Sequence, residues 1–221
     1  MLLTLREIKS KTEKFFSEKG IPNGKLETDL ILSHALNLKR LDLYLDLDRP
    51  IYEEELNQMR EMVRRRAMRE PLQYILGETV FFNCSLRVDK RALIPRPETE
   101  LLVEQILPKA QEAEHILELG TGSGAIVLAL AKAAVTAEIT AIDRDSEALA
   151  LAKSNAVALG LSEQIIFLES DWLSEVPSEK QFDVIISNPP YLTQALYDSA
   201  EPEVREFEPK QALLSADAGM A

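Results

Sequence analysis

The sequence predicts an α/β protein in which a small all-α domain and a β-hairpin linker precede a doubly wound parallel sheet. Apolar residues recur at helical spacing through residues 1–76, and from residue 113 short apolar strands alternate with helical segments. The charge also changes: residues 1–76 carry 14 Lys and Arg against 13 Asp and Glu, and residues 77–221 carry 11 against 24. We therefore expect domains at 1–76 and 98–221, joined by a linker at 77–97.

Composition narrows the class of protein. The chain has 221 residues, of which 46% are hydrophobic, but no apolar run approaches the roughly 20 residues that span a bilayer. Arg6, Glu7 and Lys9 interrupt the N-terminus too early for a signal peptide, so we expect a cytoplasmic protein that does not bind membranes. The acidic second half would repel a phosphate backbone, so no direct nucleic-acid binding is expected. A single cysteine excludes an internal disulfide, and no metal site is expected.

The first 76 residues predict three helices. In the first, over residues 2–20, Thr4 is a suitable N-cap with Glu7 three residues later, and Gly20 is a natural stop. A second helix is expected over 25–38. A third is expected over 53–68, where three glutamates open the helix and three arginines close it, as the helix dipole favours.

The linker combines a hairpin with a rigid stretch. Residues 79–89 alternate apolar and polar side chains and predict a short hairpin with Asn83 near its turn. The following segment, 92-ALIPRPETE-100, contains two prolines that prevent regular strand pairing, and a helix is expected to open at about Glu98.

The remainder alternates strands with helices. Strands are expected at 115–119, 138–143, 165–170 and 182–187, and helices at 125–134 and 145–160. This order implies a parallel sheet whose ligand site lies at the carboxyl ends of the strands.

The loop 120-GTGSGA-125 predicts a cofactor site. Gly120, Gly122 and Gly124 allow a tight turn from strand to helix and a close approach of the backbone to a ligand. Asp143 ends the next strand, 19 residues past Gly124, where a carboxylate can bind ribose hydroxyls. The pattern also satisfies the dinucleotide fingerprint with Ala125 in its last position, so a dehydrogenase is a competing interpretation. Against that, no residues for hydride transfer follow.

The stretch 188-NPPY-191 caps the last predicted strand. A planar amide or aromatic amine is a weak nucleophile because its lone pair is delocalised. If the Asn188 side-chain oxygen and the Pro189 carbonyl accepted both of its N–H hydrogens, the lone pair would be localised and directed at a methyl donor. Prolines 189 and 190 hold that geometry, and Tyr191 offers a flat face to a planar group. The structural alternative is a proline-rich turn.

These motifs together resemble a known family. The stretches 188-NPPY-191, 119-LGTGSGAI-126 and 93-LIPRPETE-100, after a helical N-terminal region, look like the HemK/PrmC-type methyltransferases. The resemblance implies a Rossmann-like methyltransferase sheet that transfers a methyl group from S-adenosylmethionine to a glutamine side-chain amide in peptide chain release factors. The NPPY motif alone is shared with methyltransferases that act on adenine and cytosine amino groups of DNA and on guanine of rRNA.

The resemblance also implies roles for individual residues. The methionine and ribose of the cofactor would lie along Gly120, Thr121, Gly122, Ser123 and Gly124. Asp143 would hold the ribose hydroxyls, and Asp171 and Trp172 would contact the adenine, although Trp172 could instead be a core residue. Asn188, Pro189, Pro190 and Tyr191 would hold the glutamine amide, with Asn188 also next to the cofactor. The helical domain would help to dock the release factor. Arg96 and Glu98 would lie near the site, or form a plain linker salt bridge or helix start.

The expected chemistry is direct in-line displacement without a covalent enzyme intermediate. No general base is evident in the motif, so water is expected to take the proton. Family sheets continue beyond the fourth strand, whereas this sequence stops soon after 201-EPEVREFEPKQAL-213, so we expect a sheet that lacks its last strands. Two other functions stay open: a nucleic-acid amino-methyltransferase, or a non-catalytic cofactor-binding fragment.

Overall fold

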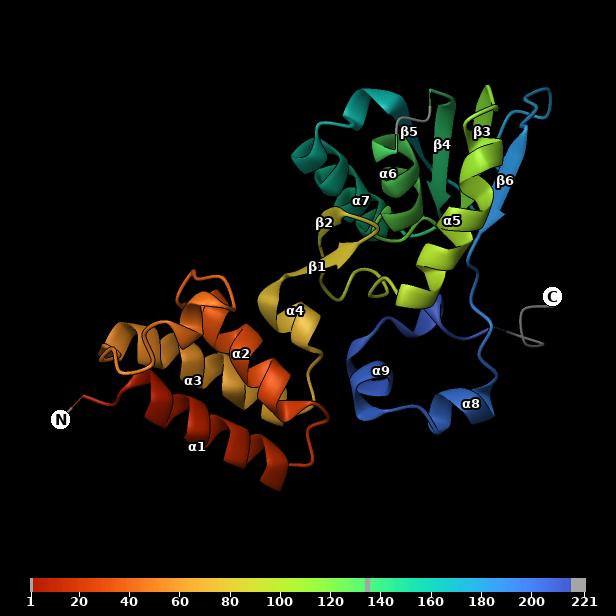
Figure 1. Cartoon of the computed structure of the whole chain (residues 1–221). Coiled ribbons are helices and arrows are strands. Elements are labelled where there is room, and N and C mark those ends of the chain that lie inside the picture. Colours follow the sequence, from red (N-terminus) through yellow and green to blue (C-terminus); the bar gives the residue numbers. More distant parts are fainter. Residues whose placement is uncertain (1, 134–135, 216–221) are drawn as a thin grey trace. The chain divides into compact units, whose positions relative to one another are not determined.

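The computed structural model describes residues 2–133 and 136–215. The chain divides into two compact units, Met1–Leu76 and Gly77–Ala221 (Figure 1). Residue 134, where the sequence predicts a helix end, and residues 216–221 of the final segment lie outside the described residues.

The first unit is helical. Its elements are α1 (Leu5–Glu18), α2 (Gly24–Ala35), the 3₁₀ turn η1 (Asp42–Tyr44), α3 (Glu53–Ala67) and α4 (Leu72–Leu76). Thr4 and Glu7 form the capping box that the sequence predicts, and Gly20, with φ 66°, follows the end of α1. The second helix ends at Ala35 rather than 38, because Asn37 adopts φ 51°, a left-handed conformation that no helix continues. The sequence analysis did not predict α4.

Two groups of buried side chains form the core of the helical unit. One joins the start of α1 to the end of α2 and the first half of α3 and comprises Leu5, Ile8, Leu32, Leu43, Ile51 and Met59. The other lies around Phe16 and includes Ile21, Ile31, Met62, Leu72 and Ile75. The apolar faces of helices of this length drive their packing, since short isolated helices are marginal in water.

The second unit begins with the predicted hairpin. Strand β1 (Glu78–Phe81) pairs antiparallel with β2 (Cys84–Arg87). Phe82 and Asn83 form the two-residue turn, and both have positive φ, as the twist of such hairpins requires. Cys84 is fully buried in the core.

The main sheet has four parallel strands in the order β5-β4-β3-β6 (Figure 1). They are β3 (His115–Leu119), β4 (Glu138–Asp143), β5 (Ile165–Glu169) and β6 (Val184–Ser187). Each lies within two residues of its predicted bounds. Register places Ile116, Ile139, Ile165 and Val184 in one row, and all four are buried in the main core. The next row exposes Ile166 and Ile185, so the two faces of the sheet differ in burial.

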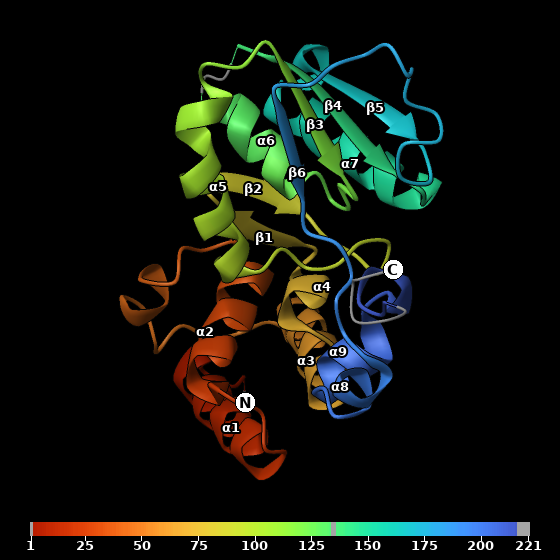
Figure 2. The same ribbon diagram turned by 90° about the vertical axis from the view of Figure 1, so that its right-hand side faces the viewer.

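Three helices cover the face on which the first of these rows lies. They are α5 (Pro97–Ala110), α6 (Ala125–Lys132) and α7 (Ser146–Leu159). Helix α6 lies between α5 and α7 and touches both, and in Figure 2 α5 stands to the left of the strands with α6 beside it. A short 3₁₀ turn, η2 (Ser162–Gln164), leads from α7 into β5.

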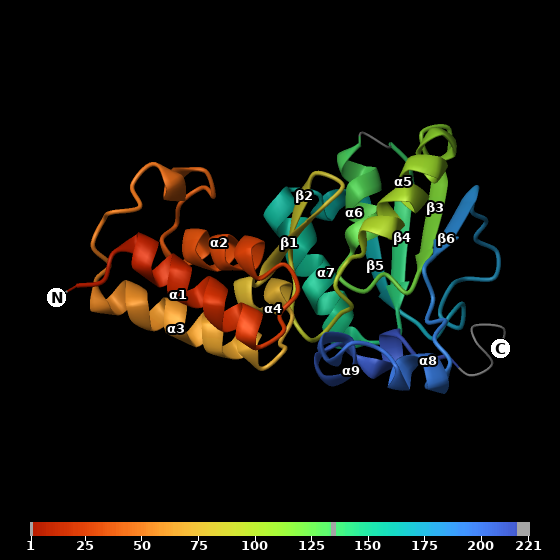
Figure 3. The same cartoon turned by 60° about the horizontal axis from the view of Figure 1, so that its bottom comes forward.

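The segment after β6 returns past the carboxyl ends of the strands. It contains α8 (Gln194–Asp198), α9 (Pro202–Phe207) and the 3₁₀ turn η3 (Lys210–Ala212). Figure 3 brings this segment forward, beyond the tips of the strand arrows. It therefore lies at the end of the sheet at which parallel α/β folds bind their ligands.

Candidate active site

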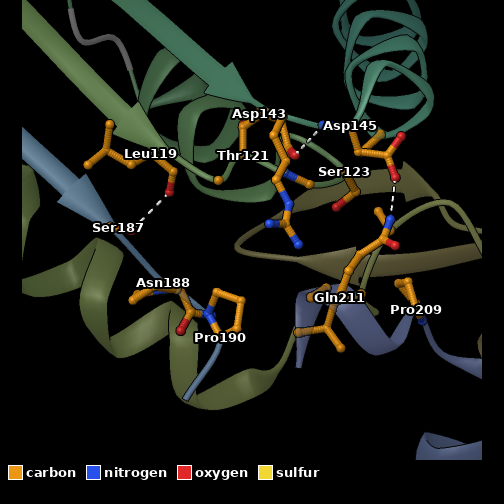
Figure 4. Close-up of a pocket in the computed structure, with 18 of the residues that line it drawn as sticks. Leu119, Thr121, Ser123, Asp143, Asp145, Ser187, Asn188, Pro190, Pro209 and Gln211 are labelled. Carbon is orange, nitrogen blue, oxygen red and sulfur yellow. Dashed lines mark hydrogen bonds between the residues drawn. The ribbon is translucent and has the colours of Figure 1, made fainter. Parts of the chain in front are cut away.

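A cavity of about 410 Å³ opens at the carboxyl ends of the sheet. Six segments line it: the loop after β3, the end of β4, the residues after β5, the end of β6, and two stretches distant in sequence, 91–99 and 209–215. In Figure 4, Asn188 and Pro190 lie on one side of this space, and Asp143 and Asp145 lie on the other. The cavity belongs entirely to the second unit, and its volume is within the usual range for small-molecule sites.

The glycine loop forms the floor beneath the N-terminus of α6. The backbone N–H groups of Gly120 and Thr121 both donate to the Ile142 carbonyl at 2.9 Å, which fixes the loop against β4. Gly120 and Gly122 have positive φ and line the cavity, and a Cβ at Gly120 would meet open space, so a ligand can approach the backbone closely there. Thr121 and Ser123 line the cavity too.

Gly124 lies where two helices pack together. It does not line the cavity, and a Cβ at this position would lie 3.0 Å from Leu128 Cδ1 and 3.2 Å from Ala152 Cβ. Ala152 belongs to α7, so the absence of a side chain at Gly124 allows α6 and α7 to pack closely. The sequence pattern alone does not distinguish a glycine that approaches a ligand from one that approaches a helix.

Asp143 holds the loop and its surroundings in place. Its Oδ2 accepts a hydrogen bond from the Gly122 N–H at 2.8 Å, and its Oδ1 accepts one from the Asp145 N–H at 3.0 Å. Each carboxylate oxygen retains a second lone pair, so Asp143 can also accept from hydroxyl groups of a ligand in the cavity. Its predicted role as a ribose ligand is compatible with this geometry.

Glu118 is a site residue that the sequence analysis missed. Its side chain is 1% exposed, lines the cavity, and accepts a hydrogen bond from the Thr121 hydroxyl at 2.5 Å. Burial raises the pKa of Glu118 to about 8; the bond from Thr121 lowers it, and the nearby Asp143 carboxylate raises it further. At neutral pH the group is therefore mainly protonated. A carboxylate within the buried run 115-HILEL-119 was the available signal.

Asp171 and Trp172 line the cavity after β5, as expected. Trp172 is 54% exposed, which excludes the alternative that it is a core residue. Its φ of 52° is unusual for a bulky residue. The turn is held by Ser170, whose hydroxyl donates to the Trp172 carbonyl at 2.7 Å and accepts from the Glu175 N–H at 3.1 Å.

The end of β6 delivers Asn188 to the cavity. The Ser187 hydroxyl donates to the Leu119 carbonyl at 3.0 Å and ties the last residue of β6 to β3 (Figure 4). Asn188, Pro189 and Pro190 line the cavity. Tyr191 does not line it and is 63% exposed. The structure therefore brings three residues of the four-residue motif to the cavity and leaves the tyrosine ring outside it.

Contacts across the cavity wall involve residues that no sequence spacing indicated. The Arg96 guanidinium pairs with the Glu208 carboxylate at 2.5 Å, and the Ile94 N–H donates to the same carboxylate at 3.2 Å. Arg96 is also the N-cap residue of α5, which begins at Pro97. The expected alternative of a salt bridge between Arg96 and Glu98 is thus replaced by a pair 112 residues apart in sequence.

Among the residues that the structure describes, no three His, Cys, Asp or Glu side chains gather so that they could hold a metal ion. None of the helices in that part of the chain is long and apolar enough to cross a membrane.

Comparison with known proteins identifies the family. Residues 7–77 match the family model of the PrmC N-terminal domain, and residues 96–203 match that of the methyltransferase small domain. The chain is 42% identical to the release factor glutamine methyltransferase of Geobacter sulfurreducens, over 98% of this chain and 75% of that protein. The chain belongs to the release factor glutamine methyltransferase family. It is also 41% identical to the release factor glutamine methyltransferase of Chlorobaculum tepidum, over 95% of this chain and 74% of that protein.

Membership of this family confirms the resemblance drawn from the sequence motifs and the expected Rossmann-like methyltransferase fold. Among solved structures, the chain is similar to the SAM dependent methyltransferase from Agrobacterium tumefaciens. That similarity has a TM-score of 0.45 and 24% identity, and it covers 51% of this chain and 39% of that one. No assignment of a site residue rests on it.

Proposed function

We propose that this protein transfers a methyl group from S-adenosylmethionine to the side-chain amide nitrogen of a glutamine in peptide chain release factors. The observation that carries the proposal is the position of Asn188. It lies at the carboxyl end of β6, in the same cavity as the glycine loop and Asp143, in a chain of the release factor glutamine methyltransferase family. A site for a nucleoside cofactor and a site for a planar amide thus share one cavity.

The residues of the cavity fit this cofactor. Gly120 and Gly122 leave space for the methionine part along the loop, and Asp143 has lone pairs free for the ribose hydroxyls. Asp171 and the half-exposed Trp172 offer a polar edge and an aromatic face for the adenine. When bound, S-adenosylmethionine supplies a methyl group on positively charged sulfur. A nitrogen lone pair can attack this methyl group directly and displace the sulfur.

Asn188 and Pro189 prepare the substrate nitrogen. The Asn188 Oδ1 and the Pro189 carbonyl accept its two N–H hydrogens and so direct its lone pair into the cavity. Because Pro189 and Pro190 have fixed φ, this pair of acceptors keeps its geometry at little entropic cost. Tyr191, outside the cavity, presents a flat face where the glutamine side chain enters.

The proton balance requires no base from the motif. Once methylated, the amide nitrogen would carry one proton too many, and it would release that proton to water. Glu118 cannot easily serve as the base, because its carboxyl group is buried, is mainly protonated at neutral pH and is bonded to Thr121. We therefore assign catalysis to positioning of the amide by Asn188 and Pro189.

The domain roles are part of the proposal. The unit of residues 1–76 serves to dock the release factor, residues 77–97 act as linker, and residues 98–221 carry the transfer. A groove of about 400 Å³ on the helical unit, which combines basic with apolar side chains, supports docking of a protein. These side chains are Phe15, Lys19, Arg60, Val63, Arg64, Ala67 and Met68. Because release factors act on ribosomes, the protein works in the cytoplasm and does not need to bind nucleic acid itself.

The test is peptide mass spectrometry of a release factor after incubation with this protein and S-adenosylmethionine. We expect one added methyl group on a single glutamine. In Asn188→Ala, the rate of this methylation should fall by at least about a hundredfold. An Asn57→Ala variant, on the exposed face of α3, is the matched control for an asparagine change. Parallel incubations with rRNA and DNA measure the alternative function, which is methyl transfer to amino groups of nucleic acid. Methyl transfer to nucleic acid, or full activity of Asn188→Ala on the release factor, would contradict the proposal.

A further inference from the structure

The carboxamide of Asn188 has two ends of nearly equal shape and opposite character. One end is the oxygen acceptor that the proposed reaction needs, and the other is an NH₂ donor. If the group rotated by half a turn, its donor would face the donor N–H of the substrate and the contact would become repulsive. Asn188 is exposed on the cavity wall, so packing does not choose between the two orientations.

The backbone of Asn188 is held in place, but its amide is not held by the backbone. The Ser187–Leu119 hydrogen bond fixes the preceding residue, and Pro189 restricts Asn188 to an extended conformation. These constraints end at the main chain. The remaining freedom is rotation of the side chain, and this rotation decides which end of the amide faces the substrate.

A second residue on the cavity wall supplies the missing constraint. The Asn188 Nδ2 donates to the Thr99 Oγ1 at 3.4 Å, a contact between residues 89 positions apart in sequence. The length is at the long end for a hydrogen bond, as is common in sites before the substrate binds. With the nitrogen end turned toward Thr99, the oxygen end is left for the substrate.

Thr99 is itself in a well-anchored place. It is in the first turn of α5, where Pro97 fixes the backbone and the Thr99 N–H donates to the Arg96 carbonyl at 3.0 Å. The adjacent Glu100 carboxylate accepts the Phe82 N–H at 3.0 Å, and Arg96 is paired with the buried Glu208. The backbone that carries the Thr99 hydroxyl is therefore anchored on both sides of it.

We propose that Thr99 is a positioning residue for methyl transfer, which selects the productive orientation of the Asn188 amide by accepting its NH₂ group. This inference rests on the proposed function. It assigns the threonine of 93-LIPRPETE-100 a task in the reaction, while the transferred methyl group, the leaving sulfur and the released proton keep the paths given above.

The experiment compares Thr99→Val, which has the same shape but no hydroxyl, with Thr99→Ser, which retains the hydroxyl. Single-glutamine methylation of the release factor gives kcat and KM, and calorimetry gives the Kd of S-adenosylmethionine. We expect Thr99→Val to lose about tenfold in kcat and Thr99→Ser less than about threefold, since one hydrogen bond is removed or kept. The KM changes little, because a protein substrate gains most of its binding energy away from the amide.

Two controls distinguish positioning from other roles. Thr79→Val, in β1 and outside the cavity, is the matched change of the same chemistry and should leave kcat unaltered. In an Asn188→Asp background, Thr99→Val should have less than about a threefold effect, because a carboxylate presents an acceptor in either orientation.

Three results would overturn the inference. The first is an equal loss in Thr99→Ser and Thr99→Val, which would show that shape rather than the hydroxyl matters. The second is a fall in affinity for S-adenosylmethionine as large as the fall in kcat, which would place the hydroxyl on the cofactor. The third is unaltered kcat in Thr99→Val. If Asn188→Ala still abolishes methylation, the inference alone fails; if Asn188→Ala remains active, the proposed role of Asn188 fails with it.

Discussion

Two aspartates make the same kind of contact at opposite ends of the parallel sheet. Asp183, just before β6, accepts hydrogen bonds from the backbone N–H groups of Glu114 at 2.8 Å and His115 at 2.9 Å. Asp143, at the end of β4, accepts from those of Gly122 at 2.8 Å and Asp145 at 3.0 Å. Only Asp143 faces a cavity. The number of hydrogen bonds therefore does not distinguish a structural carboxylate from a ligand-binding one.

The neighbours of Asp183 and Asp143 distinguish the two kinds of carboxylate. At the amino ends, charged side chains pair with one another: the Lys180 Nζ lies 2.7 Å from the Glu138 carboxylate. At the carboxyl ends, Asn188, Asp143 and Trp172 point toward a shared space of about 410 Å³. Polar groups in a structural cluster satisfy each other, whereas polar groups in a site converge on room for a ligand.

The largest effect is expected on the affinity for S-adenosylmethionine, in which the two aspartates should differ. Asp143→Ala should weaken binding of S-adenosylmethionine by about a hundredfold, because two hydrogen bonds to a charged acceptor are lost and the loop is released. Asp183→Ala should lower the melting temperature with little change in affinity. Calorimetric titration of both variants measures this difference. Similar losses of affinity in the two would remove the distinction between the ends of the sheet.

Glu208 lies near the site, but its hydrogen bonds are those of a structural carboxylate. Its side chain is 1% exposed and is held by Arg96 and the Ile94 N–H. Glu208→Ala should lower the free energy of unfolding by about 2 kcal/mol, since it leaves a buried N–H and a partly buried guanidinium without their partner. Urea unfolding measures the change. Glu208→Gln, which keeps an acceptor for these donors, is the control and should lose clearly less.

Glu118 should make the stability of the protein depend on pH. Because its folded pKa is raised to about 8, the native state holds a proton that the unfolded state has already released at neutral pH. Stability due to this group is therefore lost as pH rises through 8, by about 1.4 kcal/mol between pH 7 and 9. Urea unfolding across this range should show the loss in the wild type and not in Glu118→Gln. Equal slopes in both proteins would contradict the assignment.

Asp183 should act in the opposite direction. Hydrogen bonds from the backbone N–H groups of His115 and Glu114 lower its pKa below the usual range. Its contribution to stability is therefore present above the ordinary pKa of an aspartate and is lost as pH falls through the lowered value. The two ends of one sheet thus respond to acid and to base with opposite signs.

The smallest effect is expected from the ion pair at the amino ends. Lys180→Ala removes the contact with Glu138, in which the two side chains are 26% and 46% exposed. Exposed pairs of this kind contribute at most about 1 kcal/mol, and salt weakens them further. Thermal unfolding at low and high salt should show a small, salt-dependent loss. Methylation should be unaffected, and a large loss of activity would mean that the amino ends also take part in function.

Much of the fold follows from local pattern. The capping box at Thr4, the turn at Asn83 and the four strands lie close to where the sequence predicts them, because caps, turns and alternation of apolar residues act over a few positions. The short helix α4 and the early end of α2 were missed. Helix α4 depends on how neighbouring helices bury it, which local propensity does not record, and the early end of α2 follows from the left-handed conformation of Asn37.

The candidate site was predictable in part. The glycine loop, Asp143 and Asn188 stand directly after apolar strands, and parallel strands bring their carboxyl ends together, so sequence order placed these residues at one edge. Thr99, Glu118 and Glu208 could not be placed in this way. Their roles depend on contacts with Asn188, Thr121 and Arg96, and two of these three contacts join residues more than 80 positions apart.

The sequence by itself determined the order of elements, the glycine loop and the Asn-Pro-Pro-Tyr motif to which we assign the amide, since each is encoded within a short stretch of chain. Only the tertiary structure decided that Gly124 serves helix packing, that Tyr191 stays outside the cavity and that Glu118 is protonated at neutral pH. It also decided which residue holds the Asn188 amide. The physical reason is that burial, pKa and the choice of hydrogen-bond partner depend on distances in space, which spacing along the chain does not fix.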